Sequence, residues 1–457
     1  MNAISSALQN NLAERAKNIT RRELQVYSDR TAASQSANLR ARKVLPMGVP
    51  SSFQAYDPYP IVARRAQGGW IEDVDGNHYI DYSLGFGALF AGHCHPLVQE
   101  AMAHQIQNGT LFVSPCESNT EVAELLAERY GLPMWRFTNS GTEATMDAIR
   151  VARAITGRDH IVKVEGGYHG HHDEVMISMK PALSAAGDAS NPTPVPATAG
   201  ITQAVMRDTI VIPYNDAGAL ERVLKSGTVA CFIVEPAMQN ISICLPDDGY
   251  LQQVRDITRK YGTMLIFDEV KTGITAGWSG ATGHFGVTPD LVCLAKSIGG
   301  GLPLGAFGGS QECMDQITSG KVLHLGTFNG NPLCMAAAKA VLSQVCTKEA
   351  TLEAIARNQS IVAECDAIIA KSGIPAHTVN LGAKACVTWS VTRVRNYRDY
   401  KATDFDIAFA QWIHHINRGL MLPPGLDDQW LCSIMHTEAD TRRVAEVFEE
   451  FVEELLA

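Results

Sequence analysis

Short apolar runs alternate with helix-like periodicity through the middle of the chain. Five short, mostly apolar runs are followed by polar residues or glycine, and they lie at residues 135–137, 161–164, 230–234, 264–267 and 291–294. Between them, stretches such as 142–156 and 250–261 have the apolar spacing of helices. Strands that alternate with helices predict parallel strand–helix–strand units, with helices covering both faces of one sheet.

The N-terminal part has a different pattern. Residues 12–27 predict an amphipathic helix, and residues 45–60 predict an extended loop rich in proline, serine and glycine. Residues 70–82 predict a β-hairpin that turns at Asp75-Gly76-Asn77.

An apolar stripe over 439–456 predicts a helix that closes a smaller C-terminal domain. We expect three parts: an N-terminal segment (1–74), a large domain (75–345) and a C-terminal small domain (346–457). Residues 184–203 interrupt the alternation with small residues and proline. A long loop of this kind is typical of a mobile lid over a site.

Composition excludes several classes of protein. The 457 residues carry a net charge of −10, which argues against a nucleic-acid binder. No apolar run approaches the roughly 18 residues that span a membrane, and the first 20 residues lack the pattern of a secretory signal. The 11 scattered cysteines contain no Cys-x-x-Cys pair, which indicates reduced thiols in a cytoplasmic setting.

Two histidine-rich segments raise the question of a metal. His93 and His95 flank Cys94, and a second group comprises His169, His171 and His172. Neither segment is followed by cysteine or histidine partners at zinc spacing, so we expect no metal site.

Polar residues with distinct chemistry follow three of the predicted strands, at the edge where ligands of open α/β sheets bind. Ser140, Gly141 and Thr142 begin a helix and could bind an anion, although an ordinary helix cap is the simpler interpretation. Asp268 could bind a metal, act as a base, pair with a cationic heterocycle or cap a helix. Lys296 could be a desolvated amine nucleophile or a solvated lysine.

The combination of these three features is more specific than each alone. A helix start can bind a phosphate group, a carboxylate can pair with a protonated pyridine nitrogen, and an amine can react with an aldehyde. Together they predict pyridoxal 5′-phosphate as the cofactor.

The chain resembles the class III aminotransferases among the fold-type I pyridoxal-phosphate enzymes, and within them the branch of glutamate-1-semialdehyde 2,1-aminomutase. The matching segments are 73–77, 92–96, 137–144, 167–171, 235–236, 267–273, 286–291, 296–306, 326–332 and 394–397. The resemblance covers roughly residues 30–457. It implies a large domain with a seven-stranded, mostly parallel sheet and a smaller α+β domain.

The resemblance also implies residue roles around the cofactor ring. Lys296 matches the Schiff-base lysine, which also moves the proton, and Asp268 matches the partner of the pyridine nitrogen. Val270 and Tyr168 match the residues on the two ring faces. Asn240 lies where the branch places a hydrogen bond to the ring hydroxyl.

The remaining implied roles concern the phosphate and the oligomer. Ser140, Gly141 and Thr142 match the phosphate-binding residues. Thr327 matches the threonine that reaches the phosphate of a neighbouring subunit, which implies a homodimer with shared active sites. The N-terminal segment is expected to pack against the small domain and the partner.

The expected substrate residues depart from the family pattern. The family loop Pro-Gly-Gly-Val-x-Ser-x-x-Arg corresponds to residues 46–54, so Ser51 and Gln54 are expected to face the substrate, with Gln54 in the position of the carboxylate-binding arginine. Asp428 stands near a position where the branch has a glutamate. A cation could instead come from Arg393, Arg395 or Arg398, although solvated loop arginines are the simpler interpretation.

We therefore expect an aminotransferase that moves an amino group between an amine or amino acid and a keto acid or aldehyde. A neutral Gln54 would hold a substrate carboxylate poorly, which favours this reaction over intramolecular migration of the amine. The aminomutase reaction stays open as the alternative, as does a racemase or lyase on the same scaffold. A binding protein without catalysis is disfavoured because Lys296, Asp268 and Tyr168 are all present.

Overall fold

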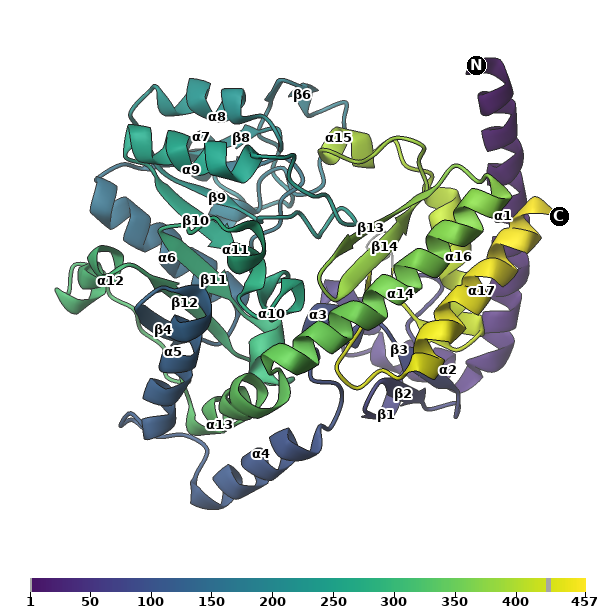
Figure 1. The fold of residues 1–457 in the computed structure, drawn as a ribbon, viewed down its shortest axis with the longest axis horizontal. Helices are drawn as coiled ribbons and strands as arrows, with labels where there is room; N and C mark the ends of the chain where they lie inside the picture. Colours follow the sequence, from purple (N-terminus) through teal and green to yellow (C-terminus); the bar gives the residue numbers. More distant parts are fainter. Residues whose placement is uncertain (1, 425–428) are drawn as a thin grey trace.

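Seven strands form the central sheet of the large domain (Figure 1). Their order is β4 (Met134–Thr138), β12 (Gly305–Gly309), β11 (Leu291–Leu294), β10 (Met264–Asp268), β9 (Val229–Val234), β5 (His160–Val164) and β8 (Thr209–Ile212). The computed structural model describes residues 2–424 and 429–457. Strands β8, β5, β9, β10 and β11 pair in parallel, whereas β12 is antiparallel to both of its neighbours. The expected seven-stranded, mostly parallel sheet is confirmed.

Helices cover both faces of this sheet. The main ones are α5 (Glu117–Tyr130), α6 (Gly141–Thr156), α8 (Ala217–Leu224), α9 (Tyr250–Tyr261), α12 (Gln311–Thr318) and α13 (Pro332–Ala340). Side chains alternate between the faces of a strand. In β9, Cys231 and Ile233 therefore pack in the cluster under α6 and α12. Phe232 and Val234 pack in the cluster under α5, α8, α9 and α13.

The five strands predicted from apolar runs correspond to β4, β5, β9, β10 and β11, and β8 and β12 were not predicted. β12 reads Gly-Ala-Phe-Gly-Gly, a composition with low strand propensity. Its glycines allow close approach, because a Cβ on Gly308 would lie 2.4 Å from the ring of Trp135. A Cβ on Gly305 would lie 2.3 Å from the carbonyl oxygen of Ser140.

The smaller domain combines both ends of the chain. A four-stranded sheet contains β1 (Ala63–Gln67), β2 (Trp70–Asp73), β3 (His78–Asp81) and β15 (Leu420–Met421). A three-stranded sheet contains β13 (His377–Leu381), β14 (Lys384–Thr388) and β16 (Trp430–Leu431). β2 and β3 form the predicted hairpin, in which Asp73 accepts hydrogen bonds from the backbone of Asp75 (2.9 Å) and Asn77 (2.8 Å). The expected boundary between residues 74 and 75 falls inside this hairpin.

Long helices complete the smaller domain. They are α1 (Asn2–Arg30), α2 (Ala32–Ala41), α14 (Lys348–Ser372), α16 (Phe405–Asn417) and α17 (Glu438–Leu456). The predicted helices 12–27 and 439–456 lie in α1 and α17. α1 packs along α16 and α17, so the N-terminal helix lies beside the C-terminal one (Figure 1). Among the described residues, no helix has the length and apolarity needed to span a bilayer.

Short elements connect these parts. They are α3 (Leu84–Gly87), α4 (Pro96–Asn108), α7 (Gln203–Asp208), α10 (Gly273–Ala276), α11 (Gly280–Phe285) and α15 (Tyr397–Tyr400), with the paired strands β6 (Gly187–Asp188) and β7 (Asn191–Pro192). The expected loop 45–60 contains two single turns of 3₁₀ helix, Pro46–Gly48 and Ser52–Gln54.

Candidate active site

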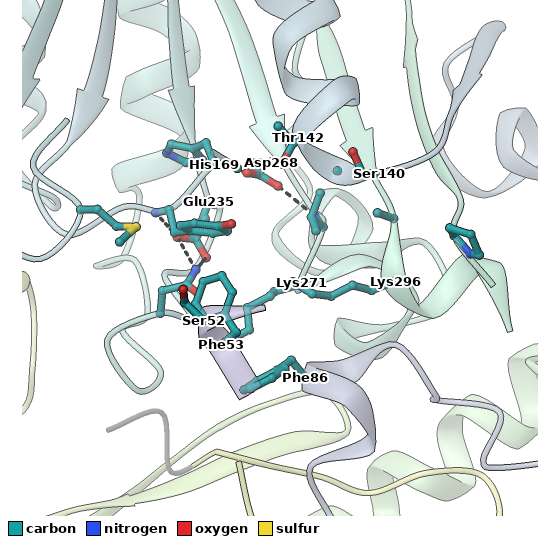
Figure 2. A pocket seen from close by; sticks show the side chains of 18 of the residues that line it. Ser52, Phe53, Phe86, Ser140, Thr142, His169, Glu235, Asp268, Lys271 and Lys296 are labelled. Atoms are coloured by element: carbon teal, nitrogen blue, oxygen red, sulfur yellow. Dashed lines mark hydrogen bonds and ion pairs between the residues drawn. The ribbon is translucent and has the colours of Figure 1, made fainter. Parts of the chain in front are cut away.

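A cavity of about 520 Å³ lies where β4, β10 and β11 end (Figure 2). This volume lies within the range of about 300–1,000 Å³ that is usual for small-molecule sites. Its wall includes Ser140, Gly141, Thr142, Tyr168, Asn240, Asp268, Val270 and Lys296. These residues come from five separate stretches of sequence, and the parallel sheet brings them to one edge.

The N-terminus of α6 forms one end of the cavity. Ser140 is the N-cap residue, and its Oγ accepts a hydrogen bond from Glu143 N at 3.2 Å. A Cβ on Gly141 would lie 2.7 Å from Val270 Cγ2, so only glycine fits there. The backbone N–H groups of a first helical turn lack intrahelical partners and favour an anion. This end of the cavity therefore suits a phosphate.

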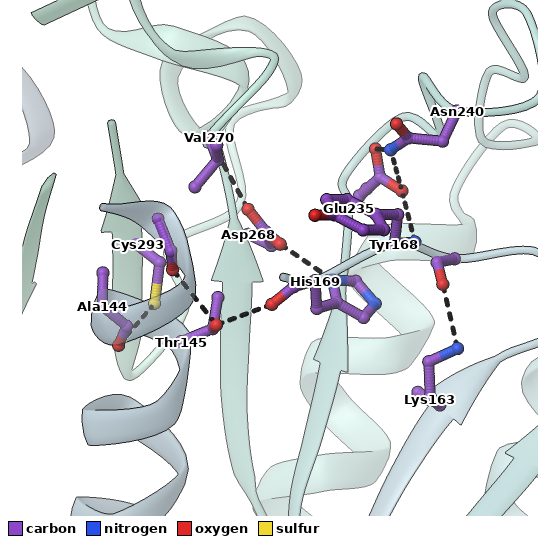
Figure 3. A network of polar contacts seen from close by, with 12 residues as sticks. Ala144, Thr145, Lys163, Tyr168, His169, Glu235, Asn240, Asp268, Val270 and Cys293 are labelled. Carbon is purple, nitrogen blue, oxygen red and sulfur yellow. Dashed lines mark hydrogen bonds and ion pairs between the residues drawn. The ribbon is translucent and has the colours of Figure 1, made fainter. Parts of the chain in front are cut away.

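Asp268, the last residue of β10, is held by two hydrogen bonds (Figure 3). Its Oδ1 accepts from Val270 N at 3.0 Å, and its Oδ2 lies 2.8 Å from His169 Nδ1. His169 is buried, and its carbonyl accepts a hydrogen bond from Thr145 Oγ1 at 2.6 Å. A carboxylate fixed in this way can pair with a protonated ring nitrogen in the cavity.

Glu235 organises the neighbouring wall (Figure 3). This carboxyl group follows β9 and accepts hydrogen bonds from Asn240 Nδ2 (3.2 and 3.1 Å), Tyr168 N (3.3 Å) and Gln239 N (3.0 Å). Burial raises the pKa of Glu235. Glu235 lies in one of the segments that match the family, but its role was not predicted from the sequence. The signal that could have revealed it was its position at the end of a predicted strand.

Tyr168 forms an aromatic wall with two residues from the N-terminal part of the chain. Its ring contacts Phe53 edge to face, with centroids 5.5 Å apart, and Phe53 lies 6.1 Å from Phe86. Burial and the charge of Asp268 raise the pKa of Tyr168 to about 12. The phenol is therefore neutral at physiological pH.

Lys296 follows β11 and extends along the cavity wall (Figure 2). Its backbone has a positive φ of 51°, which is uncommon for a residue with a side chain. Such conformations cluster at functional sites, where the surrounding structure holds them. This geometry agrees with the predicted role of Lys296 as the reacting amine.

The residues expected to bind substrate are placed differently. Among the residues that the structure describes, Ser52 and Phe53 line the cavity, whereas Ser51 and Gln54 are exposed and do not line it. Asp428 lies outside the described residues. Substrate roles for Ser51, Gln54 and Asp428 therefore stay predictions.

The loop arginines have partners elsewhere. Arg398 binds Glu165 with its Nε at 2.9 Å from Oε2, and the Nε of Arg395 lies 3.1 Å from Asp247 Oδ2. Arg393 donates to the carbonyl groups of residues 245 and 246. None of the three lines the cavity. Arg393 and Arg395 are exposed, as the simpler interpretation expects, whereas Arg398 is partly buried in its ion pair with Glu165.

The segment 184–203 also lies away from the wall. Arg398 donates to the carbonyl oxygens of Ala186 and Gly187, each at 3.0 Å, and no residue of the segment lines the cavity. The opening and closing expected for this segment stays a prediction. Thr327 is exposed and outside the wall as well, so its contact with a partner's phosphate also stays a prediction.

The clustered histidines take part in protein hydrogen bonds. His171 Nδ1 lies 3.0 Å from Thr142 Oγ1, and His172 Nδ1 lies 2.9 Å from Glu174 Oε2. Within residues 2–424 and 429–457, no three histidine, cysteine, aspartate or glutamate side chains are grouped as metal ligands.

The residues around the cavity fit pyridoxal 5′-phosphate. The start of α6 can bind its phosphate, and Asp268 can pair with its ring nitrogen. Tyr168 and Val270 can pack on the two faces of the ring, and Lys296 can react with the aldehyde. A mostly parallel seven-stranded sheet with this site defines a fold-type I pyridoxal-phosphate enzyme. The model of the class III aminotransferase family matches residues 52–375, and the chain belongs to this family.

Similar proteins of known name or structure agree with this assignment. The glutamate-1-semialdehyde 2,1-aminomutase of Methanothermobacter thermautotrophicus is 40% identical over 424 residues, covering 90% of this chain and 96% of that protein. The crystal structure of a glutamate-1-semialdehyde aminomutase from Pseudomonas aeruginosa PAO1 superimposes with a TM-score of 0.88 at 29% identity, over 97% of this chain and 99% of that one. An omega-transaminase from Sphaerobacter thermophilus also has a TM-score of 0.88, at 32% identity, over 93% and 98% of the two chains.

Proposed function

We propose that this chain moves an amino group from one carbon atom to another in small amino compounds. The observation that carries the proposal is that Lys296, Asp268 and the start of α6 line one cavity. Bound pyridoxal 5′-phosphate supplies an electron sink for the substrate carbon. The residues of this chain bind it, orient it and move protons around it.

Each residue has a defined task in this proposal. Lys296 would hold the cofactor through its Nζ, and the free amine would take a proton from the substrate carbon and return one. Asp268, oriented by His169, keeps the ring nitrogen protonated. Asn240, oriented by Glu235, donates to the ring hydroxyl. Tyr168 and Val270 hold the ring between them.

The first candidate reaction is intramolecular transfer, in which the amino group moves from carbon 2 to carbon 1 of a single substrate. Curated relatives support it, since proteins that are 38% and 40% identical to this chain are named glutamate-1-semialdehyde 2,1-aminomutase. This was the alternative in the sequence analysis, and the comparisons support it better than the transaminase expected there.

The second candidate is intermolecular transfer between an amine or amino acid and a keto acid or aldehyde. The aromatic wall of Phe53, Phe86 and Tyr168 favours it, because such a wall suits an apolar substituent. The likeness to an omega-transaminase structure also supports it.

A homodimer is part of the proposal. The segment around Thr327 presents large apolar side chains to solvent, with Leu323, Leu325 and Phe328 between 58% and 81% exposed. Apolar surface of this kind marks contact with another protein surface. A second copy of the chain would cover it and bring Thr327 to the partner's cavity.

The cysteines support a reducing compartment such as the cytoplasm. All 11 are free thiols, and nine of them are buried. Disulfides are rare in compartments that keep thiols reduced.

One experiment separates the two reactions. The purified holoenzyme is incubated with glutamate-1-semialdehyde alone, and the product is identified by mass spectrometry and NMR. Conversion to the 1-amino isomer without a second substrate supports intramolecular transfer. A requirement for separate donor and acceptor supports the transaminase, and no reaction with any amino compound would refute the proposed function.

A further inference from the structure

One buried residue in the connection between β9 and α9, Gln239, contacts the smaller domain. Its side-chain oxygen accepts a hydrogen bond from Lys384 Nζ at 3.0 Å, and its carbonyl oxygen accepts one from Gln429 Nε2 at 2.6 Å. Lys384 begins β14 and Gln429 precedes β16, so both donors belong to the smaller domain. All three residues are at most 4% exposed, so these hydrogen bonds are shielded from water.

The chemistry of the donor fixes the orientation of the Gln239 amide. An ammonium group only donates hydrogen bonds, so the oxygen of the amide must face Lys384. The same ammonium group also donates to the carbonyl oxygen of Lys271 at 2.6 Å. Lys384 therefore connects the smaller domain to two separate segments of the large domain.

Gln239 also contacts the group that orients Asn240. The backbone N–H of Gln239 and the side-chain amide of Asn240 donate to the same oxygen of Glu235, Oε2, at 3.0 and 3.1 Å. Figure 3 shows this carboxylate beside Asn240. Gln239 directly precedes Asn240, which lines the cavity. A shift of Gln239 therefore moves both the carboxylate that holds Asn240 and the backbone that carries it.

We propose that Gln239 is a positioning residue, whose contact with Lys384 transmits the position of the smaller domain to Asn240 and so sets how strongly Asn240 donates to the cofactor. The proposal rests on the proposed function and deepens it by naming a contact that couples domain packing to the cofactor. In the described part of the chain, neither Gln239 nor Lys384 lines the cavity, so both act through other residues. The coupling applies to intramolecular and intermolecular transfer alike.

The test changes the Gln239 side chain and follows the bound cofactor. Gln239→Met keeps the backbone bond to Glu235 and removes the bond to Lys384, whereas Gln239→Glu keeps an acceptor oxygen for Lys384. Gln239→Asn shortens the side chain by one methylene and is a second loss variant, in case Gln239→Met does not fold. The readouts are the pH midpoint of the visible absorption of the cofactor and its dissociation constant from equilibrium dialysis.

The expected shifts follow from the charge on the ring oxygen. Weaker donation by Asn240 leaves more negative charge on that oxygen, which holds the neighbouring proton of the bound cofactor more tightly. In Gln239→Met the pH midpoint should rise by about 0.5–1 unit, and the dissociation constant should rise about three- to ten-fold. Gln239→Glu should recover at least about half of each change, because its carboxylate accepts a charge-assisted bond from Lys384.

Arg395→Met is the matched control. The ion pair of Arg395 with Asp247 also joins the two domains, but neither residue lines the described part of the cavity wall. Arg395→Met should therefore leave both readouts unchanged. Adding Lys384→Met to Gln239→Met should produce little further shift, because the two residues act through one bond. Thermal midpoints show whether each variant is folded.

Three results would overturn the proposal. They are unchanged readouts in a folded Gln239→Met or Gln239→Asn holoenzyme, equal shifts in Arg395→Met, and no recovery in Gln239→Glu. The readouts need bound cofactor but no turnover. A wild type that binds the cofactor without transferring amino groups would therefore refute the proposed function and leave the Gln239 assignment standing.

Discussion

The buried lysine behind the active site should make the stability of this protein depend on pH. Lys163 on β5 is fully buried, and its ammonium donates to the carbonyl oxygens of Gly167 (2.9 Å) and Ile177 (2.6 Å). These bonds hold the segment that leads into Tyr168. Burial lowers the pKa of Lys163 to about 7, although the charges of Glu235 and Glu165 oppose this shift.

The sign of the effect follows from proton binding in the two states. The unfolded chain holds the Lys163 proton up to its ordinary pKa of about 10.5, whereas the folded protein releases it above about 7. Between these values the unfolded state binds one more proton, so stability rises with pH by at most about 1.4 kcal/mol per pH unit. From pH 7 to about pH 9, the wild type should gain about 2–3 kcal/mol relative to Lys163→Met.

The assay is urea unfolding of the holoenzyme and of Lys163→Met, from about pH 6 to about pH 9. The difference between the two unfolding free energies isolates the lysine from other titrating groups. Lys260→Met is the control, because Lys260 is exposed and its pKa is raised by its bond to Glu221, so it stays charged throughout. A pH-independent difference for Lys163→Met would refute the reasoning.

Three further variants test the cofactor site and the dimer. Borohydride reduction followed by peptide mapping should place the label on Lys296, and the Lys296→Ala variant should lose both the label and turnover. A label on another lysine would contradict the assignment. His169→Leu removes the hydrogen bond to Asp268, worth about 1.5–3 kcal/mol, so the cofactor dissociation constant from equilibrium dialysis should rise at least ten-fold. An unchanged constant would show that His169 does not support Asp268. Thr327→Ala should lower cofactor affinity without changing the dimer in analytical ultracentrifugation, and an active wild-type monomer would disprove shared sites.

Local patterns were sufficient for most of the large domain. The five apolar runs and the helices between them appear as predicted, because burial on both faces of a parallel sheet requires continuous apolar strands. Ser140, Asp268 and Lys296 each follow a predicted strand, and they line one cavity as this position predicts. Parallel strands carry their carboxyl ends to a common edge, so this placement follows from the strand assignment alone.

Other features depend on contacts between distant parts of the chain. β12 escaped prediction because its glycines serve close packing against Trp135 and Ser140, which no local pattern records. Hydrogen bonds from Tyr168 and Asn240 determine the role of Glu235.

The sequence by itself predicted the fold class, the cofactor and the strand-end residues that line the cavity. Only the tertiary structure decided which side chains form the substrate wall, where Phe53 and Lys271 line the cavity and Gln54 does not. The direction of a loop side chain is set by what it packs against. Phe53 packs on Tyr168, and Lys271 donates to the carbonyl of Gln239; both partners come from distant segments. The residue type and its position in the family pattern do not show which way such a side chain points, because the direction depends on contacts that form only in the folded protein.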